Sequence, residues 1–140
     1  MRSRSIWKLV LLISTTTACS VQPSTESLTK ELKTVTSWTE TAHLVGDFWL
    51  QGNVPNAYAK QTLQTTEEKL QKEIEKLAKV TPEPNRNEVL NSVQQMQRTV
   101  GEMGTAVVQK DRDTLSKKMQ QLSAQEQAIN TLIKRLGGES

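Results

Sequence analysis

The sequence holds one cysteine, Cys19, and one histidine, His43, the two residue types that most often serve as nucleophiles or transition-metal ligands. A catalytic nucleophile needs a base beside it, and a metal centre needs several ligands. Helical bundles can hold haem between a histidine and a methionine, and Met96, Met103 and Met119 recur at helical spacing. A haem or small-molecule carrier that uses His43 is therefore one alternative function.

Motifs for other kinds of chemistry are missing from the sequence. It contains no Gly-x-Ser-x-Gly, no Cys-x-x-Cys-His and no glycine-rich phosphate loop. Because there is a single histidine, no pair of nucleophile and general base can be named. We therefore expect a protein that is not an enzyme and that binds neither a metal nor another cofactor.

Residues 1–18 have the composition of an export signal. Three basic residues lie among the first eight, and an uncharged, largely apolar stretch follows over residues 9–18. That stretch is too short to cross a membrane as a helix, which needs about 20 apolar residues. The sequence therefore predicts a secretory signal that ends just before Cys19.

The residues Thr16-Thr17-Ala18-Cys19 resemble the lipobox of bacterial lipoproteins, with threonine where that family usually has an aliphatic residue at position 16. In that family a peptidase cuts between the residues that correspond to Ala18 and Cys19, and the cysteine carries the lipid. The resemblance implies a signal peptide over residues 1–18 and a lipidated tether over 19–25. It also implies export and lipid anchoring to a bacterial envelope membrane, with the folded part facing the periplasm or a lumen. Ordinary signal cleavage after Ala18 and an uncleaved membrane anchor are the alternatives.

The excess of positive charge belongs to the signal segment. The whole chain has 18 Lys and Arg against 15 Asp and Glu, a net charge of +3. Arg2, Arg4 and Lys8 account for that difference, so the chain from Cys19 onward is neutral. A basic chain often binds nucleic acid, but here the basic residues serve export, and we expect no nucleic-acid partner.

After the tether, apolar residues recur at spacings of three and four over four segments, the pattern of amphipathic helices. The predicted helices cover residues 26–51, 54–80, 85–109 and 113–136. Pro82 and Pro84 separate the second helix from the third, and Asn85 is expected to cap the third. The sequence therefore predicts an all-α, up-down-up-down four-helix bundle over residues 26–137, which we expect to be a monomer.

The boundary between the third and fourth predicted helices contains neither glycine nor proline. Its four consecutive charged residues, 110–113, cannot face a core on any side, and Asp111 or Asp113 could cap the next helix. These features favour a tight turn. The alternative is one continuous helix, which would favour an antiparallel coiled-coil dimer.

All aromatic residues after the signal lie between positions 38 and 58: Trp38, Phe48, Trp49 and Tyr58. Phe48, Trp49 and Leu50 are consecutive and cover about 200° of the helix circumference, wider than a buried stripe of about 100°. They cannot all face one core. Either this corner closes the end of the bundle as a hydrophobic plug, or part of it stays exposed as a partner-binding surface.

The sequence favours a non-enzymatic, membrane-tethered envelope lipoprotein that acts as a protein-binding or accessory subunit. The membrane, through the lipid on Cys19, and an envelope protein, through the aromatic residues, are the expected partners. The expected architecture also resembles the lipidated four-helix extrinsic subunits of photosystem II, the PsbQ-like proteins. That resemblance rests on architecture alone and implies an extrinsic photosystem subunit as a further alternative.

Overall fold

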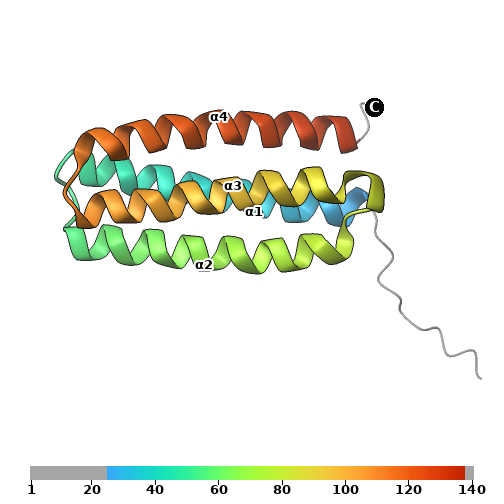
Figure 1. Ribbon diagram of the computed structural model, residues 1–140, viewed down its shortest axis with the longest axis horizontal. Coiled ribbons are helices and arrows are strands. Elements are labelled where there is room, and N and C mark those ends of the chain that lie inside the picture. Colours follow the sequence, from blue (N-terminus) through green and yellow to red (C-terminus); the bar gives the residue numbers. More distant parts are fainter. Residues whose placement is uncertain (1–24, 138–140) are drawn as a thin grey trace, which may run out of the picture.

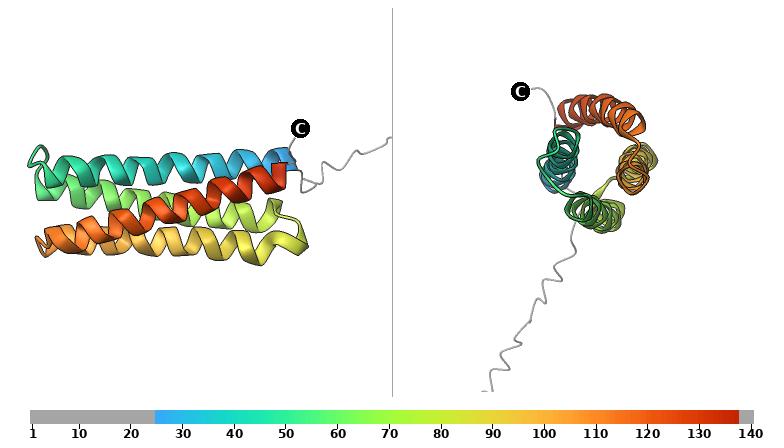
Figure 2. Two further views of the ribbon diagram at one scale, coloured as in Figure 1. Left: turned by 90° about the horizontal axis from the view of Figure 1, so that it is seen from above. Right: turned by 90° about the vertical axis from the view of Figure 1, so that its left-hand side faces the viewer.

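The computed structural model describes residues 25–137, which form four helices of nearly equal length. These are α1 (Thr25–Leu50), α2 (Asn56–Val80), α3 (Glu83–Val108) and α4 (Arg112–Gly137). Successive helices run antiparallel, and seen end-on they stand at the corners of a square in chain order (Figures 1 and 2). The prediction of an all-α four-helix bundle is therefore confirmed over the described residues.

Each helix turns one apolar stripe toward the common axis, and the four stripes form a single core. Its largest fully buried side chains come from all four helices: Leu28, Leu32, Leu63, Leu70, Leu77, Met96, Met103, Leu115, Leu122 and Ile129. The stripe of α4 shifts by one residue in its last turns. Leu132 occupies the buried position, while Ile133 and Leu136 are only partly buried.

The bundle has two distinct ends (Figure 1). The start of α1, the α2–α3 connection and the end of α4 lie together at one end, which we call the Thr25 end. The α1–α2 and α3–α4 connections lie at the other, which we call the Gly52 end. At 1.5 Å of rise per residue, the two ends are about 38 Å apart.

Both connections at the Gly52 end follow the same backbone pattern, in which a residue of left-handed conformation stops a helix. Gly52 has φ 75°, and Lys110 has φ 55°. After α1, the Asn53 amide donates to the Phe48 carbonyl over 2.8 Å; after α3, the Asp111 amide donates to the Ala106 carbonyl over 2.9 Å. These are the bonds of a Schellman motif, which satisfies carbonyls left free at a helix end.

The turn between α3 and α4 is present, so the alternative of one continuous helix is wrong. Asp111 caps α4: its Oδ1 accepts a hydrogen bond from the Thr114 amide over 3.0 Å, and its Oδ2 accepts one from the Thr114 hydroxyl over 2.6 Å. These two bonds hold the pKa of the Asp111 carboxyl below its ordinary value. The cap explains how a helix can begin here without proline or glycine.

The expected start of α3 is wrong. Asn85 does not cap the helix, because α3 already begins at Glu83, with Pro84 in its first turn. Proline fits there because the first amides of a helix have no partner within it. The signal residues Ala18 and Cys19, and the tether up to residue 24, lie outside the described residues. None of the four helices has an apolar stretch that would let it span a membrane.

Candidate functional site

Trp49 closes the core at the Gly52 end and is only 6% exposed. Its indole Nε1 donates a hydrogen bond to Oδ1 of Asn56, at the start of α2, over 2.6 Å. The guanidinium of Arg112 stands 5.6 Å from the centre of the ring and also donates to the Leu50 carbonyl. Trp49 therefore acts as the hydrophobic plug, the first of the two alternatives for this corner, and it is not part of an exposed surface.

Trp38 lies apart from the other aromatic residues, near the middle of α1. It is half-buried between α1 and α2, and the Lys69 ammonium stands 5.6 Å from the centre of its ring. About ten residues of helix, or roughly 15 Å, separate it from Phe48. Trp38 and Trp49 thus do not join Phe48 and Tyr58 in one surface.

The exposed apolar residues of α1 and α2 gather near the Gly52 end. Leu44 is 55% exposed, Phe48 is 40% exposed and Tyr58 is 55% exposed. Leu44 and Phe48 are one turn apart on the same face of α1. The pairs Trp38–Lys69 and Glu31–Lys76 fix the register between the two helices, and the same register brings Tyr58 level with Phe48.

We call Leu44, Phe48 and Tyr58 the distal apolar surface. Leu44 was not expected from the sequence, although its position one turn before Phe48 was a signal for it. Two carboxylates border this surface on the α4 side, Glu40 and Asp47, and neither has an ion pair within residues 25–137. The surface is therefore apolar with an acidic edge.

His43 contacts α4 rather than a methionine. Its Nε2 lies 3.2 Å from the Ser123 hydroxyl and 3.5 Å from Oε2 of Glu126, whose Oε1 is buried without a hydrogen-bond partner. A Ser–His–acid triad would place the carboxylate on the other ring nitrogen. Here both neighbours share Nε2, so the cluster lacks the arrangement that activates a serine.

The sequence Glu40-Thr41-Ala42-His43 has the Glu-x-x-His spacing of di-iron bundles. That chemistry needs two such motifs and two further glutamates, all facing inward. Glu40 instead lies on the exposed face of α1. Within residues 25–137, no group of three or more histidine, cysteine or acidic side chains has the geometry to hold a metal ion.

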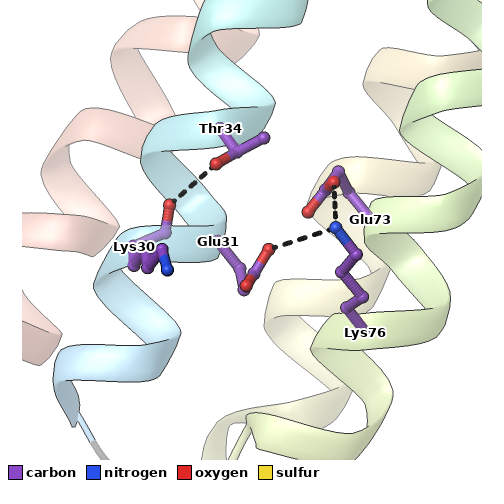
Figure 3. A network of polar contacts seen from close by, with 5 residues as sticks. All are labelled: Lys30, Glu31, Thr34, Glu73 and Lys76. Atoms are coloured by element: carbon purple, nitrogen blue, oxygen red, sulfur yellow. Dashed lines mark hydrogen bonds and ion pairs between the residues drawn. The ribbon is translucent and has the colours of Figure 1, made fainter.

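A second polar cluster joins α1 to α2 nearer the Thr25 end (Figure 3). Lys76 of α2 lies between two carboxylates: its Nζ is 2.9 Å from Oε1 of Glu73 and 3.9 Å from Oε2 of Glu31. Glu73 is buried, which is unusual for a glutamate. Its hydrogen bond with Glu31, together with burial and the charge of Glu73, raises the pKa of the Glu31 carboxyl.

The Glu31 carboxyl therefore keeps its proton to a higher pH than an isolated glutamate would. The hydrogen bond and charge of Glu73 also raise the pKa of Lys76, which stays positively charged. This network links α1 to α2 through charged residues that the sequence alone does not distinguish from ordinary surface charges. It has the character of a structural contact with pH-dependent strength.

The chain matches no known protein-family model, and no curated protein or solved structure matches it either.

Proposed function

We propose that this chain is a lipid-anchored protein of a bacterial envelope that has no catalytic activity and binds a protein partner through the distal apolar surface. The proposal combines the lipobox-like residues before and at Cys19 with the direction of the bundle. Thr25, where α1 begins, follows Cys19 by six residues, so the tether reaches at most about 20 Å. A lipid on Cys19 would hold the Thr25 end next to the membrane.

The observation that carries the proposal is the position of the distal apolar surface at the opposite end. Leu44, Phe48 and Tyr58 lie about 29–35 Å from the Thr25 end by helix rise. An anchored bundle would present them to periplasmic or lumenal proteins, beyond the reach of the lipid headgroups. Exposed aromatic and aliphatic residues grouped in this way are typical of binding surfaces.

The acidic edge indicates which kind of partner fits. A protein surface that offers apolar side chains flanked by Lys or Arg would bury Phe48 and Tyr58 and pair with Glu40 and Asp47. The Ser123–His43–Glu126 cluster offers no comparable support for hydrolysis or for haem binding.

Photo-crosslinking in native membranes tests the proposal. A photoreactive residue at position 48 should give a discrete crosslinked product with one partner protein. The same residue at Gln94, which is exposed on α3, is the matched control and should not give that product. Asp47→Lys should leave the bundle fold unchanged and should weaken the crosslink at position 48. Equal crosslinking from positions 48 and 94 would refute the assignment of the binding surface.

A further inference from the structure

The charge of α1 and α2 changes along the length of the bundle. In the half nearer the Thr25 end, residues 25–38 and 69–80 carry six lysines and four glutamates. In the half nearer the Gly52 end, residues 39–50 and 56–68 carry one lysine and four acidic residues. The helix pair α1 and α2 is thus basic at one end and acidic at the other.

The lysines of α2 follow one line along the helix. Lys69, Lys72, Lys76 and Lys79 are spaced by three, four and three residues, which places them on one side of α2. Contacts of Lys69 with Trp38 and of Lys76 with Glu31 show that this side adjoins α1. We call these four residues, with Lys30 and Lys33 of α1, the lysine stripe.

The acidic residues of this half offset the lysine stripe only in part. Five of its six lysines are exposed, all except Lys69. Glu73 is buried beneath Lys76, and Glu31 is largely covered in the same network (Figure 3). Glu26 and Glu75 are the exposed acidic residues of this half. The surface that solvent meets here is therefore predominantly basic.

We propose that the lysine stripe binds the anionic headgroups of the membrane that holds the lipid anchor. This rests on the proposed anchoring at Cys19, which would keep the Thr25 end within about 20 Å of the bilayer. Lys79 and Lys30 lie nearest that end, and Lys69 lies farthest from it. Each lysine close to an anionic membrane strengthens binding about fivefold, and the effect fades over a Debye length of about 10 Å.

A membrane fits this surface better than an acidic protein does. The tether would hold one membrane permanently beside the lysine stripe, whereas a protein would have to reach the same narrow space. The sign change along α1 and α2 also suits an anchored molecule, because the acidic residues of the Gly52 half would be repelled by the same lipids whenever the bundle tilted toward them. Together the two halves would set the bundle's tilt on the membrane.

Vesicle sedimentation with the chain from position 19 onward, carrying Cys19→Ser and therefore no lipid, tests the proposal. The probes are vesicles of phosphatidylcholine alone and vesicles with about one-third phosphatidylglycerol. The chain should bind the anionic vesicles and release them as salt rises from about 0.05 M to about 0.5 M. Binding that is equal for both vesicles would overturn the proposal.

Two triple variants of equal net charge locate the interaction. Lys30→Gln, Lys72→Gln and Lys79→Gln together should weaken binding about 100-fold, because three contributions of about fivefold are lost. The control triple variant, Lys60→Gln, Lys110→Gln and Lys117→Gln, removes exposed lysines away from the stripe and should bind nearly as the parent does. Equal losses in both triple variants would show general charge attraction and would overturn the assignment.

Soluble competitors distinguish other anions from a lipid surface. Millimolar glycerol phosphate should leave vesicle binding intact. If glycerol phosphate abolished vesicle binding, that result would indicate a discrete phosphate site. Polyglutamate should bind more weakly than anionic vesicles at equal charge, and tighter binding would indicate an acidic protein and overturn the proposal. The tested chain carries no lipid, so a lack of vesicle binding would overturn the lysine stripe as a membrane site without contradicting anchoring at Cys19. An unmodified Cys19 in the mature protein would refute anchoring, whatever the result of the vesicle experiment.

Discussion

Replacing Trp49 should destabilise the bundle by an amount that its contacts allow us to work out. Trp49→Phe keeps an aromatic ring in the plug but loses the hydrogen bond from Nε1 to Asn56, whose partner atoms are 2.6 Å apart. That bond contributes about 0.5–1.5 kcal/mol. The contact with Arg112, 5.6 Å from the ring centre, contributes about 0.5–1 kcal/mol and weakens with phenylalanine.

We therefore expect Trp49→Phe to lower the free energy of unfolding by about 1–2.5 kcal/mol. Trp49→Ala also loses the buried ring and should lower the free energy of unfolding by about 3–5 kcal/mol. Urea unfolding followed by circular dichroism measures both. Asn56→Ala, alone and with Trp49→Phe, gives a double-mutant cycle whose coupling energy should be about 0.5–1.5 kcal/mol.

Fluorescence quenching checks the same claim without a change in stability. With Trp38→Phe as background, acrylamide should quench Trp49 much less than it quenches free tryptophan, because Trp49 is 6% exposed. A cost below about 1 kcal/mol for Trp49→Ala, or free access of acrylamide, would refute the plug and would return Trp49 to the set of candidate binding residues.

Four further substitutions give graded or pH-dependent outcomes. Gly104→Ala should stabilise the bundle by about 0.5–1 kcal/mol through helix propensity. Gly46→Ala should stabilise it less, because the new Cβ would lie 2.8 Å from Sδ of Met119, whose side chain must move. A larger gain at Gly46 than at Gly104 in urea unfolding would contradict this packing. Lys110→Gly should stabilise the bundle by about 0.5–1 kcal/mol, because glycine adopts the left-handed backbone conformation at φ 55° without strain. A loss of stability would contradict that conformation. The pKa of the Glu31 carboxyl is raised in the folded chain, so its contribution to stability is complete at acid pH and is lost as pH rises through that pKa. Glu31→Gln should match the parent's melting temperature near pH 4 and exceed it near pH 8. A difference in melting temperature that does not depend on pH would contradict the raised pKa of Glu31.

The arrangement of helices could be predicted from the sequence because each stripe has a clear period and each connection has a physical reason. The charged run 110–113 illustrates this, since no face of a continuous helix could bury it. The position of a helix start is harder to predict. The two prolines predict a helix that starts after Pro84, but proline also fits the first turn of a helix, and α3 begins at Glu83.

Individual side chains at the site were less predictable. The width of the run Phe48-Trp49-Leu50 shows that not all three can face the core, but only the bundle's geometry shows that Trp49 does so. Burial of Glu73 has no sequence signal, because a glutamate on a helix is usually solvated. Contacts between distant helices, such as that of His43 with Ser123, depend on register and rotation that periodicity does not fix.

The central claim, a bundle held to a membrane through Cys19, is tested most directly by the intact mass of the mature protein. The protein extracted from cell membranes should begin at Cys19 and carry the added mass of its acyl chains, and Cys19→Ser should lose that mass and leave the membrane fraction. A mature chain that begins at Cys19 with a free thiol, or that retains residues 1–18, would contradict the account.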